Sequence, residues 1–299
     1  MYDCIIIGGG PAGLSAALVL GRSMREVLLF DHGKPRHAPA RHSHGFITRD
    51  GVTPAEFRTL AYKDLSAYPS IQKKEEEVID VRHHNRGGFE VLSSTGTRET
   101  ARTLLLSSGI QEKLPQIRGL DSFYGQSLFS CPYCDGYEVR GKKLVLITES
   151  KNAFATAQII QHWSKALVLC TNGHSIVTPD QYRMLQVRGI QVTDQPIHQL
   201  LGKDGQLAGI AFTNGDKLSC EAGFVTPQLS HSGHLSYKLR CQLNDKGAIQ
   251  TDGYGRTSIR GIYAAGDNSV ITPTQLVIAA GEGSRAAIGI NMDLIHADF

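Results

Sequence analysis

The sequence predicts an α/β fold built from two nucleotide-binding units, the second inserted into the first. Three observations lead to this prediction. A strand, a glycine-rich turn, a helix and a second strand follow one another in residues 2–31. A similar strand–helix–strand order returns at residues 142–170, and residues 244–299 resemble the completion of the first unit. Strands that alternate with helices in this way are typical of parallel sheets.

The first unit begins with a glycine motif in the context that a dinucleotide site requires. The apolar run YDCIII is followed by Gly8-x-Gly10-x-x-Gly13, a helix that starts near Pro11, and the strand VLLFD, which ends at Asp31. Gly8 permits a tight turn, Gly10 lets the backbone approach a pyrophosphate, and Gly13 lets helix and strand pack closely. The helix N-terminus favours phosphate, and Asp31 stands where a ribose-binding carboxylate belongs.

Other elements follow from shorter patterns. The charge run Lys73–Glu77 is expected to be a solvated face. Apolar alternation, β-branched residues and turn signals indicate the rest. These are a helix at 54–68, hairpin strands at 77–84 and 87–94, a strand at 100–109, a strand at 142–148, a helix at 152–164, a strand at 165–170, hairpins at 198–220 and a final helix at 274–292.

Composition excludes several classes of protein. The 299 residues, 41% hydrophobic and 20% charged, suit a globular chain of about two domains. The net charge of +3 is too small to indicate a nucleic-acid partner. No apolar run is long enough for a transmembrane segment, and the apolar N-terminus lacks the basic start of a signal peptide. We therefore expect a cytoplasmic protein.

The segment FSCPYCDGYE places Cys131 and Cys134 in a Cys-x-x-Cys motif that is followed directly by Asp135. This spacing fits half a zinc site, a structural disulfide or a redox-active dithiol. Zinc needs a second pair of ligands, and no other CxxC or HxxxH is present, so no metal is expected. A purely structural disulfide is rare in the cytoplasm. A redox-active pair is the favoured interpretation, and the other cysteines are expected to be small buried hydrophobes.

Three motifs in this order resemble the low-molecular-weight thioredoxin reductases over nearly the whole chain. They are GGGPAG, CPYCDGYE and TSIRGIYAAGD…TQLVIAAGEGSRAA. The resemblance implies two Rossmann-like, three-layer ββα domains. An FAD-binding domain would comprise 1–113 and 244–299, and a central domain, 114–243, would carry the redox pair. It also implies a homodimer and a thiol or disulfide partner, either a protein or a small dithiol.

The resemblance also assigns roles to residues. Cys134 would face the flavin, Cys131 would meet the thiol partner, and Asp135 would act as the acid/base, although Asp135 also suits an N-cap. The final helix would direct its N-terminus at the flavin. The implied FAD-binding residues are Gly8, Gly10, Pro11, Ala12, Gly13, Asp31, Val78, Ser108, Gly109, Gly266, Asp267, Gln275 and Leu276.

The central unit departs from the reductases where NADPH would bind. Thr148, Glu149 and Ser150 occupy the places of glycines, and a carboxylate there would repel a pyrophosphate. The next strand is followed by Thr171 and Asn172 rather than by the arginines that grip a 2′-phosphate. We therefore expect that NADPH is not used.

Without NADPH, the sequence leaves several functions open. The favoured one is dithiol oxidation, as in the pyridine-nucleotide-independent, diflavin-linked relatives, in which a second FAD fills the vacated groove. A ferredoxin-dependent flavin thioredoxin reductase and an oxygen-using small-molecule dithiol oxidase are alternatives, as is a redox-sensing flavoprotein without turnover. His42 and His44, in a loop that departs from the reductases, could lie over the flavin or carry protons, although surface histidines are equally consistent with the pattern.

Overall fold

The structure is a computed structural model that describes residues 1–299 except 86, 232–233 and 272. Its larger lobe contains a mixed sheet in which β1, β2, β3, β6 and β17 run parallel, while β4, β5 and β6 form an antiparallel meander. The strands are β1 (Tyr2–Ile7), β2 (Val27–Phe30), β3 (Ile71–Lys74), β4 (Val78–His83), β5 (Phe89–Ser93), β6 (Arg98–Leu106) and β17 (Ile262–Ala264).

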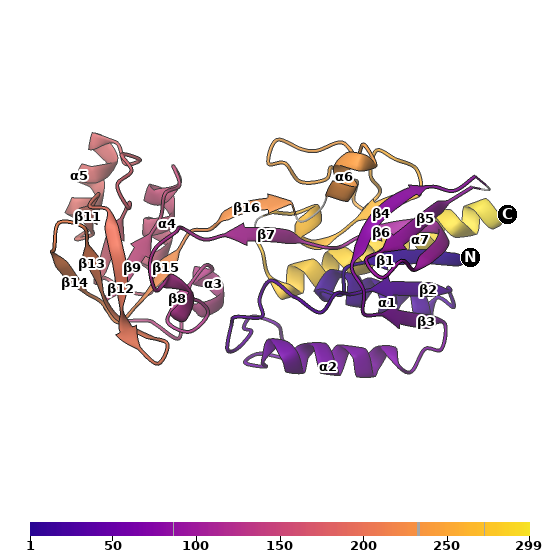
Figure 1. The fold of residues 1–299 in the computed structure, drawn as a ribbon, viewed down its shortest axis with the longest axis horizontal. Helices are drawn as coiled ribbons and strands as arrows, with labels where there is room; N and C mark the ends of the chain where they lie inside the picture. The colour runs from indigo at the N-terminus through magenta and orange to yellow at the C-terminus, as the bar shows by residue number, and fades with distance from the viewer. Residues whose placement is uncertain (86, 232–233, 272) are drawn as a thin grey trace.

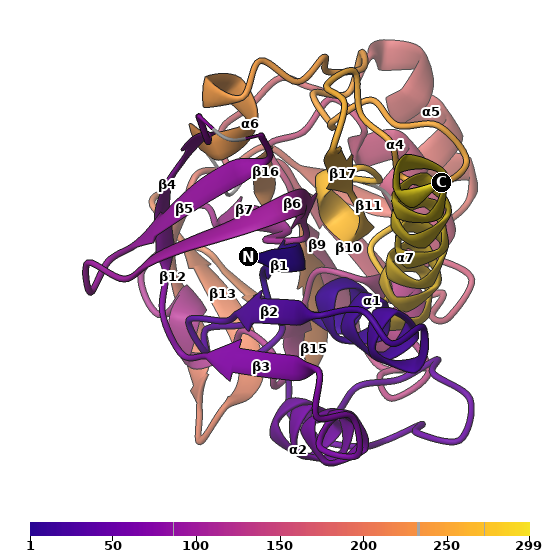
Figure 2. The same cartoon turned by 90° about the vertical axis from the view of Figure 1, so that its right-hand side faces the viewer.

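Two helices, α1 (Pro11–Arg22) and α7 (Leu276–Asp298), lie side by side against one face of this sheet, as Figure 2 shows. Small residues allow their close approach, because a Cβ at Gly283 of α7 would collide with the carbonyl of Ala12 in α1. The buried side chains of both helices and of β1, β2 and β6 form one apolar core. A third helix, α2 (Pro54–Leu65), begins at a Thr53 cap and packs beside α1.

The smaller lobe contains a parallel sheet and an antiparallel one. The parallel order is β11-β10-β9-β15-β8, and the antiparallel order is β12-β13-β14. The elements are η1 (Leu120–Ser122), β8 (Leu128–Phe129), α3 (Pro132–Asp135), β9 (Leu144–Ile147), α4 (Ala153–Ile160), β10 (Leu167–Cys170), α5 (Pro179–Val187), β11 (Gln191–Thr193), β12 (Ile197–Lys203), β13 (Gln206–Phe212), β14 (Lys217–Ser219) and β15 (Ala222–Val225).

The two lobes are joined by β7 (Ile110–Lys113) and β16 (Gln228–His231), which pair antiparallel between them in Figure 1. The short elements α6 (His234–Lys238) and η2 (Gly266–Asn268) then follow in the larger lobe. Leu235, Leu239 and Cys241 already pack in the core on the second face of the larger sheet. The domain bounds at 113/114 and 243/244 stay a prediction, and this packing favours a return to the larger lobe at β16.

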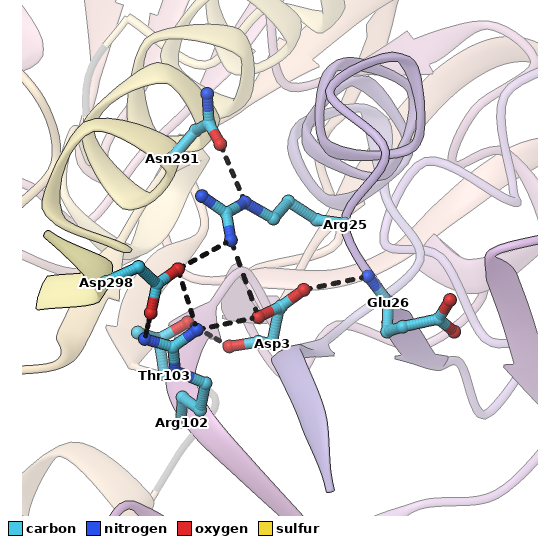
Figure 3. A network of polar contacts seen from close by, with 7 residues as sticks. All are labelled: Asp3, Arg25, Glu26, Arg102, Thr103, Asn291 and Asp298. Atoms are coloured by element: carbon cyan, nitrogen blue, oxygen red, sulfur yellow. Dashed lines mark hydrogen bonds and ion pairs between the residues drawn. The ribbon is translucent and has the colours of Figure 1, made fainter. Parts of the chain in front are cut away.

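A polar network fastens the C-terminal turn of α7 to the beginning of the chain (Figure 3). Arg25 and Arg102 each pair with the carboxylates of both Asp3 and Asp298. Arg25 also donates to Asn291 through Nε at 2.8 Å. The network explains why α7 extends to residue 298, beyond the predicted end at 292.

The predicted α/β class with two Rossmann-like units is confirmed, but some local predictions were wrong. The helix expected at 152–164 ends at Ile160. The charge run at 73–77 is solvated as expected, because none of its residues is buried. The strand within it was not predicted: Lys73 and Lys74 lie in β3, hydrogen-bonded along β2, while Glu76 accepts hydrogen bonds from Ser93 and Thr95. Polar strand residues at a sheet edge have the same composition as a solvated charge run, which explains why the strand was missed.

Candidate functional site: a nucleotide cavity that ends at a disulfide

In the turn between β1 and α1, the backbone packs closely at Gly8 and Gly13, while Gly10 faces unoccupied space. A Cβ at Gly8, whose φ is +112°, would collide with the backbone of Ser107, and a Cβ at Gly13 would collide with the carbonyl of Gly8. At Gly10, by contrast, a Cβ would meet no atom within 4 Å. The three glycines therefore have the packing that the motif predicts: two permit close approach, and Gly10 faces open space at the helix N-terminus.

Asp31, at the end of β2, is buried and faces the same space. Its carboxylate accepts hydrogen bonds from Tyr62, from Arg58 at 2.7 Å and from the amide of Gly33 at 3.0 Å. Burial opposes ionisation, but these hydrogen bonds and the Arg58 charge outweigh it, so the pKa of Asp31 lies below its ordinary value. Asp31 is therefore a fixed anion in the wall.

These residues line a cavity of about 790 Å³ that runs from the glycine turn to the Cys-x-x-Cys segment. With one exception, the cavity wall contains every residue that the sequence proposed for the cofactor or the redox chemistry. Gly13 is the exception, because it packs behind the turn. The proposed residues in the wall are Gly8, Gly10, Pro11, Ala12, Asp31, Val78, Ser108, Gly109, Cys131, Cys134, Asp135, Gly266, Asp267, Gln275 and Leu276.

The far end of the cavity is formed by a disulfide between Cys131 and Cys134, whose Cα atoms are 5.3 Å apart. Cys131 caps α3, where its Sγ accepts the amide N–H of Cys134 at 3.1 Å. Pro132 starts this short helix, because its fixed φ suits the first helical position. Both cysteine residues are partly exposed and line the cavity, so a thiol can approach the disulfide from the cavity or from its rim.

Asp135 follows the disulfide directly, and its electrostatic environment is unusual. Burial and the nearby charge of Glu138 raise the pKa of Asp135 to about 7, while His44 acts in the opposite direction. A carboxyl group with this pKa can both hold and release a proton near neutral pH, as a general acid/base must.

Sequence reasoning missed a second set of wall residues, which the loop after β2 brings together. Arg36 pairs with Glu112 of β7 and, at 3.0 Å, with Asp267, while the hydroxyl of Tyr124 donates to Glu112 at 2.6 Å. The same loop contacts the smaller lobe at Gly125, where a Cβ would collide with the carbonyl of Pro39. No local sequence pattern distinguishes these residues, because their partners lie 76 and 231 positions away.

The cavity fits a flavin dinucleotide on an observation independent of its glycines. His37 lines the wall, and its Nε2 is buried without a hydrogen-bond partner among the described residues. Burial, together with Arg36 and Arg58, lowers the pKa of His37 to about 4, so the ring is neutral. An unpaired buried nitrogen is costly, and a polar ligand in the cavity would satisfy it. The open position at Gly10 also leaves room for a pyrophosphate.

The corresponding turn in the smaller lobe, between β9 and α4, is built differently. Asn172, at φ +50°, donates to the carboxylate of Glu149 at 2.7 Å and accepts the amide N–H of Ile197 at 2.9 Å. His174 lies 3.8 Å from the same carboxylate. We call this Glu149–Asn172 contact the clasp, because it links the turn after β9 to the turn after β10.

Comparisons with known proteins agree with the fold and the site. The family described as pyridine nucleotide-disulphide oxidoreductase matches residues 2–169. The structure of a putative thioredoxin reductase TrxB from Bacillus anthracis is 37% identical, covers 100% of both chains and has a TM-score of 0.96. The structure of HlmI is 33% identical, covers 99% of this chain and 93% of its own, and has a TM-score of 0.95. Thioredoxin reductase sirT from Leptosphaeria maculans is 28% identical over 100% of this chain and 96% of its own length.

Fold and site together define a flavin-linked disulfide oxidoreductase. The chain belongs to the pyridine nucleotide-disulphide oxidoreductase family and is thioredoxin reductase-like within it. Within the described residues, no helix has both the length and the apolar character needed to cross a membrane.

Proposed function

We propose that this protein passes electrons between the Cys131–Cys134 pair and FAD without using NADPH, and that it works in the direction of dithiol oxidation. One observation carries the proposal. The nucleotide cavity of the larger lobe ends at a disulfide, whereas the NADPH-type turn of the smaller lobe is occupied by the Glu149–Asn172 clasp.

FAD, when bound, supplies a two-electron acceptor and donor next to the disulfide. The glycine turn and the N-terminus of α1 would hold its phosphates, and Asp31 would accept from a ribose hydroxyl. Gly266 and Asp267, at the opposite wall, would hold the chain between the phosphates and the ring. Gln275 and Leu276, together with the N-terminus of α7, would lie at the ring edge. Val78, Ser108 and Gly109 also line the cavity, and we propose that they contact the bound FAD.

The exchange step at the disulfide balances within the protein and its substrate. A substrate thiolate attacks Sγ of Cys131, an S–S bond to the substrate forms, and Cys134 leaves with the electron pair. Asp135 donates its proton to the departing sulfur and regains one from the second substrate thiol. That second sulfur, now a thiolate, attacks the substrate sulfur bonded to Cys131, and Cys131 leaves with the electron pair. Cys131 takes up from solvent the proton that the first substrate thiol released when it became a thiolate, so the substrate loses two electrons and two protons, and the cysteine pair gains both.

The clasp supports the absence of NADPH chemistry for two reasons. Glu149 places a carboxylate in the turn that would hold a pyrophosphate, and its negative charge would repel the phosphate oxygens. Asn172 and Thr171 stand where a 2′-phosphate would need arginine, and the amide of Asn172 is already engaged on both sides.

A second candidate is an NADPH-dependent thioredoxin reductase, which the names of the relatives from Leptosphaeria maculans and Bacillus anthracis favour. The ferredoxin-dependent, oxygen-using and redox-sensing alternatives and a second FAD stay predictions, as does a cytoplasmic location. A homodimer is supported by the exposed apolar side chains Ile288, Met292 and Ile295 along α7.

An anaerobic titration tests the proposal directly. The flavin spectrum of the purified protein is recorded, and excess NADPH is added to one sample and dithiothreitol to another. We expect the dithiol to bleach the flavin and NADPH to leave it oxidised. Bleaching by NADPH within seconds would establish the second candidate instead. The flavin absorbance per chain also distinguishes one FAD from two.

A further inference from the structure

His44 reaches from the larger lobe to the redox segment of the smaller lobe. It belongs to the loop between β2 and α2 and lines the cavity together with Cys131, Cys134 and Asp135. Its Nε2 lies 3.7 Å from a carboxylate oxygen of Glu138, three residues after Asp135. The ring therefore spans the boundary between the two lobes.

The other ring nitrogen of His44 is held by its own loop. Nδ1 lies 3.5 Å from Oδ1 of Asp50, and the same oxygen accepts the amide N–H of Gly45 at 2.8 Å. The neighbouring His42, with its ring centre 6.3 Å away, is turned to the carbonyl of Gly51 at 2.9 Å. The ring of His44 thus contacts Asp50 of its own loop through Nδ1 and Glu138 of the smaller lobe through Nε2.

His44 and Glu138 both act on Asp135, and they act in opposite directions. Glu138 disfavours the ionised form of Asp135, whereas His44 favours it. His44 also pairs with Glu138, so it offsets the repulsion between the two carboxylates. Both charges belong to the surroundings of the disulfide, but they come from different lobes.

We propose that His44 is a positioning residue for thiol–disulfide exchange, which holds Glu138 across the lobe boundary and sets how readily Asp135 releases its proton to Cys134. This inference rests on the proposed chemistry of the Cys131–Cys134 pair. Asp135 remains the group that transfers the proton, from its carboxyl to the departing sulfur of Cys134. His44 transfers no electrons and forms no bond to the substrate.

The proposal explains why the loop after β2 crosses to the smaller lobe at this point. In its protonated form, His44 beside two adjacent carboxylates favours their ionised forms, so it offsets the repulsion that keeps a proton on Asp135. Because His44 comes from the larger lobe, the balance at Asp135 depends on the two lobes being in contact. Exchange is therefore fastest when the disulfide faces the nucleotide cavity.

The test compares His44→Gln and Glu138→Gln with the wild-type protein. The fully reduced protein is alkylated with iodoacetamide, and the rates at Cys131 and Cys134 are followed by mass spectrometry between pH 5 and pH 9. This readout needs no turnover and no electron acceptor. Anaerobic flavin bleaching by dithiothreitol is measured in parallel, as the ratio of variant to wild type at each pH, so that ionisation of the reagent cancels.

We expect the wild-type profile to contain an ionisation of Asp135, whose pKa burial and Glu138 raise to about 7 beside the disulfide. His44→Gln should move it to higher pH and Glu138→Gln to lower pH, each by roughly half a unit or more, since nearby charges shift pKa values by about 1–3 units when close. His198→Gln, at an exposed position of β12, is the matched control and should leave the profile unchanged.

Shifts in the same direction, or no shift in either variant, would overturn the role of His44. Failure of the proposed function gives a different result. In that case, either NADPH would bleach the wild-type flavin or the dithiol would not bleach it at any pH, whatever the alkylation profiles show.

Discussion

The chain contains two strand–turn–helix units of the same design, and their turns differ in the groups that surround them. In the larger lobe, β1 leads into Gly8–Gly13 and α1, and a side chain added at Gly10 would project into a cavity. In the smaller lobe, β9 leads into residues 148–152 and α4, and the turn is linked by Glu149 to Asn172. Both strands are equally buried where they enter the turn.

The difference separates what maintains the fold from what binds the ligand. Apolar strand residues such as Leu144 and Leu146 keep the second sheet in place whether or not its turn accepts a phosphate. The turn residues contribute little to the core, so they can change without loss of the architecture. A Rossmann-like unit is therefore evidence for a fold, and its turn must be examined separately for function.

Gly10→Ala should have the largest effect, which is a loss of FAD affinity in the first unit. The added Cβ meets no protein atom, so the chain should fold normally, but the methyl group occupies space where the cofactor backbone would approach. Crowding of this kind costs about 1–3 kcal/mol, which corresponds to FAD binding weaker by roughly 5- to 150-fold. FAD content by absorbance and affinity by fluorescence titration measure this loss.

Ser150→Ala, in the turn after β9, is the matched control for Gly10→Ala. It should keep its full FAD content. If Gly10→Ala retains wild-type affinity for FAD, the glycine turn is not the phosphate site.

Asn172→Gly tests the second unit and should affect stability rather than cofactor content. The change removes both hydrogen bonds of Asn172 and leaves Glu149 and the amide of Ile197 without these partners. Glycine accepts the positive φ without strain, so the expected loss of about 1–3 kcal/mol in unfolding free energy combines the lost hydrogen bonds with the larger backbone entropy of glycine in the unfolded chain. Urea unfolding measures this free energy.

Asn172→Ala should lose about 1–2 kcal/mol more than the glycine variant, because it adds left-handed strain. Neither variant should lose FAD or gain reduction by NADPH. Loss of FAD in parallel with stability would contradict the division of roles between the two lobes.

Asp298→Ala should have the smallest effect, since it lies outside both turns. Its carboxylate pairs with Arg25 and Arg102 but is nearly half exposed, so its loss should reduce the free energy of unfolding only slightly. Thermal unfolding with FAD bound measures this change. Asp180→Ala removes a largely exposed pair with Arg183 and should change nothing measurable. A loss in Asp298→Ala as large as the loss in Asn172→Gly would mean that the network of Figure 3 also stabilises the cofactor site.

Sequence patterns predicted the parts of the site that are local. The glycine turn and CPYCD each consist of neighbouring residues whose spacing carries the chemistry, and the helix after the glycine turn begins at Pro11, where the pattern placed it. The short helix at Pro132–Asp135 was not predicted, and its N-cap is Cys131 rather than Asp135, which ends it. Arg36, His37 and Glu112 could not be found in this way, because they meet only after the loop behind β2 folds across the cavity. The raised pKa of Asp135 is likewise a product of tertiary burial, which no linear motif encodes.

The contact between Gly125 and the loop at Pro39 fixes how closely the two lobes approach each other beside the site. Because Gly125 has no side chain, the backbone of the loop at Pro39 lies directly against the backbone of the smaller lobe at this point. Reacting groups lose on the order of 100-fold in rate when they are misplaced by about 1 Å. The alignment of the disulfide with the cavity thus depends on a residue of the cavity wall that has no side chain, and we expect a single methyl group at position 125 to place the disulfide out of alignment.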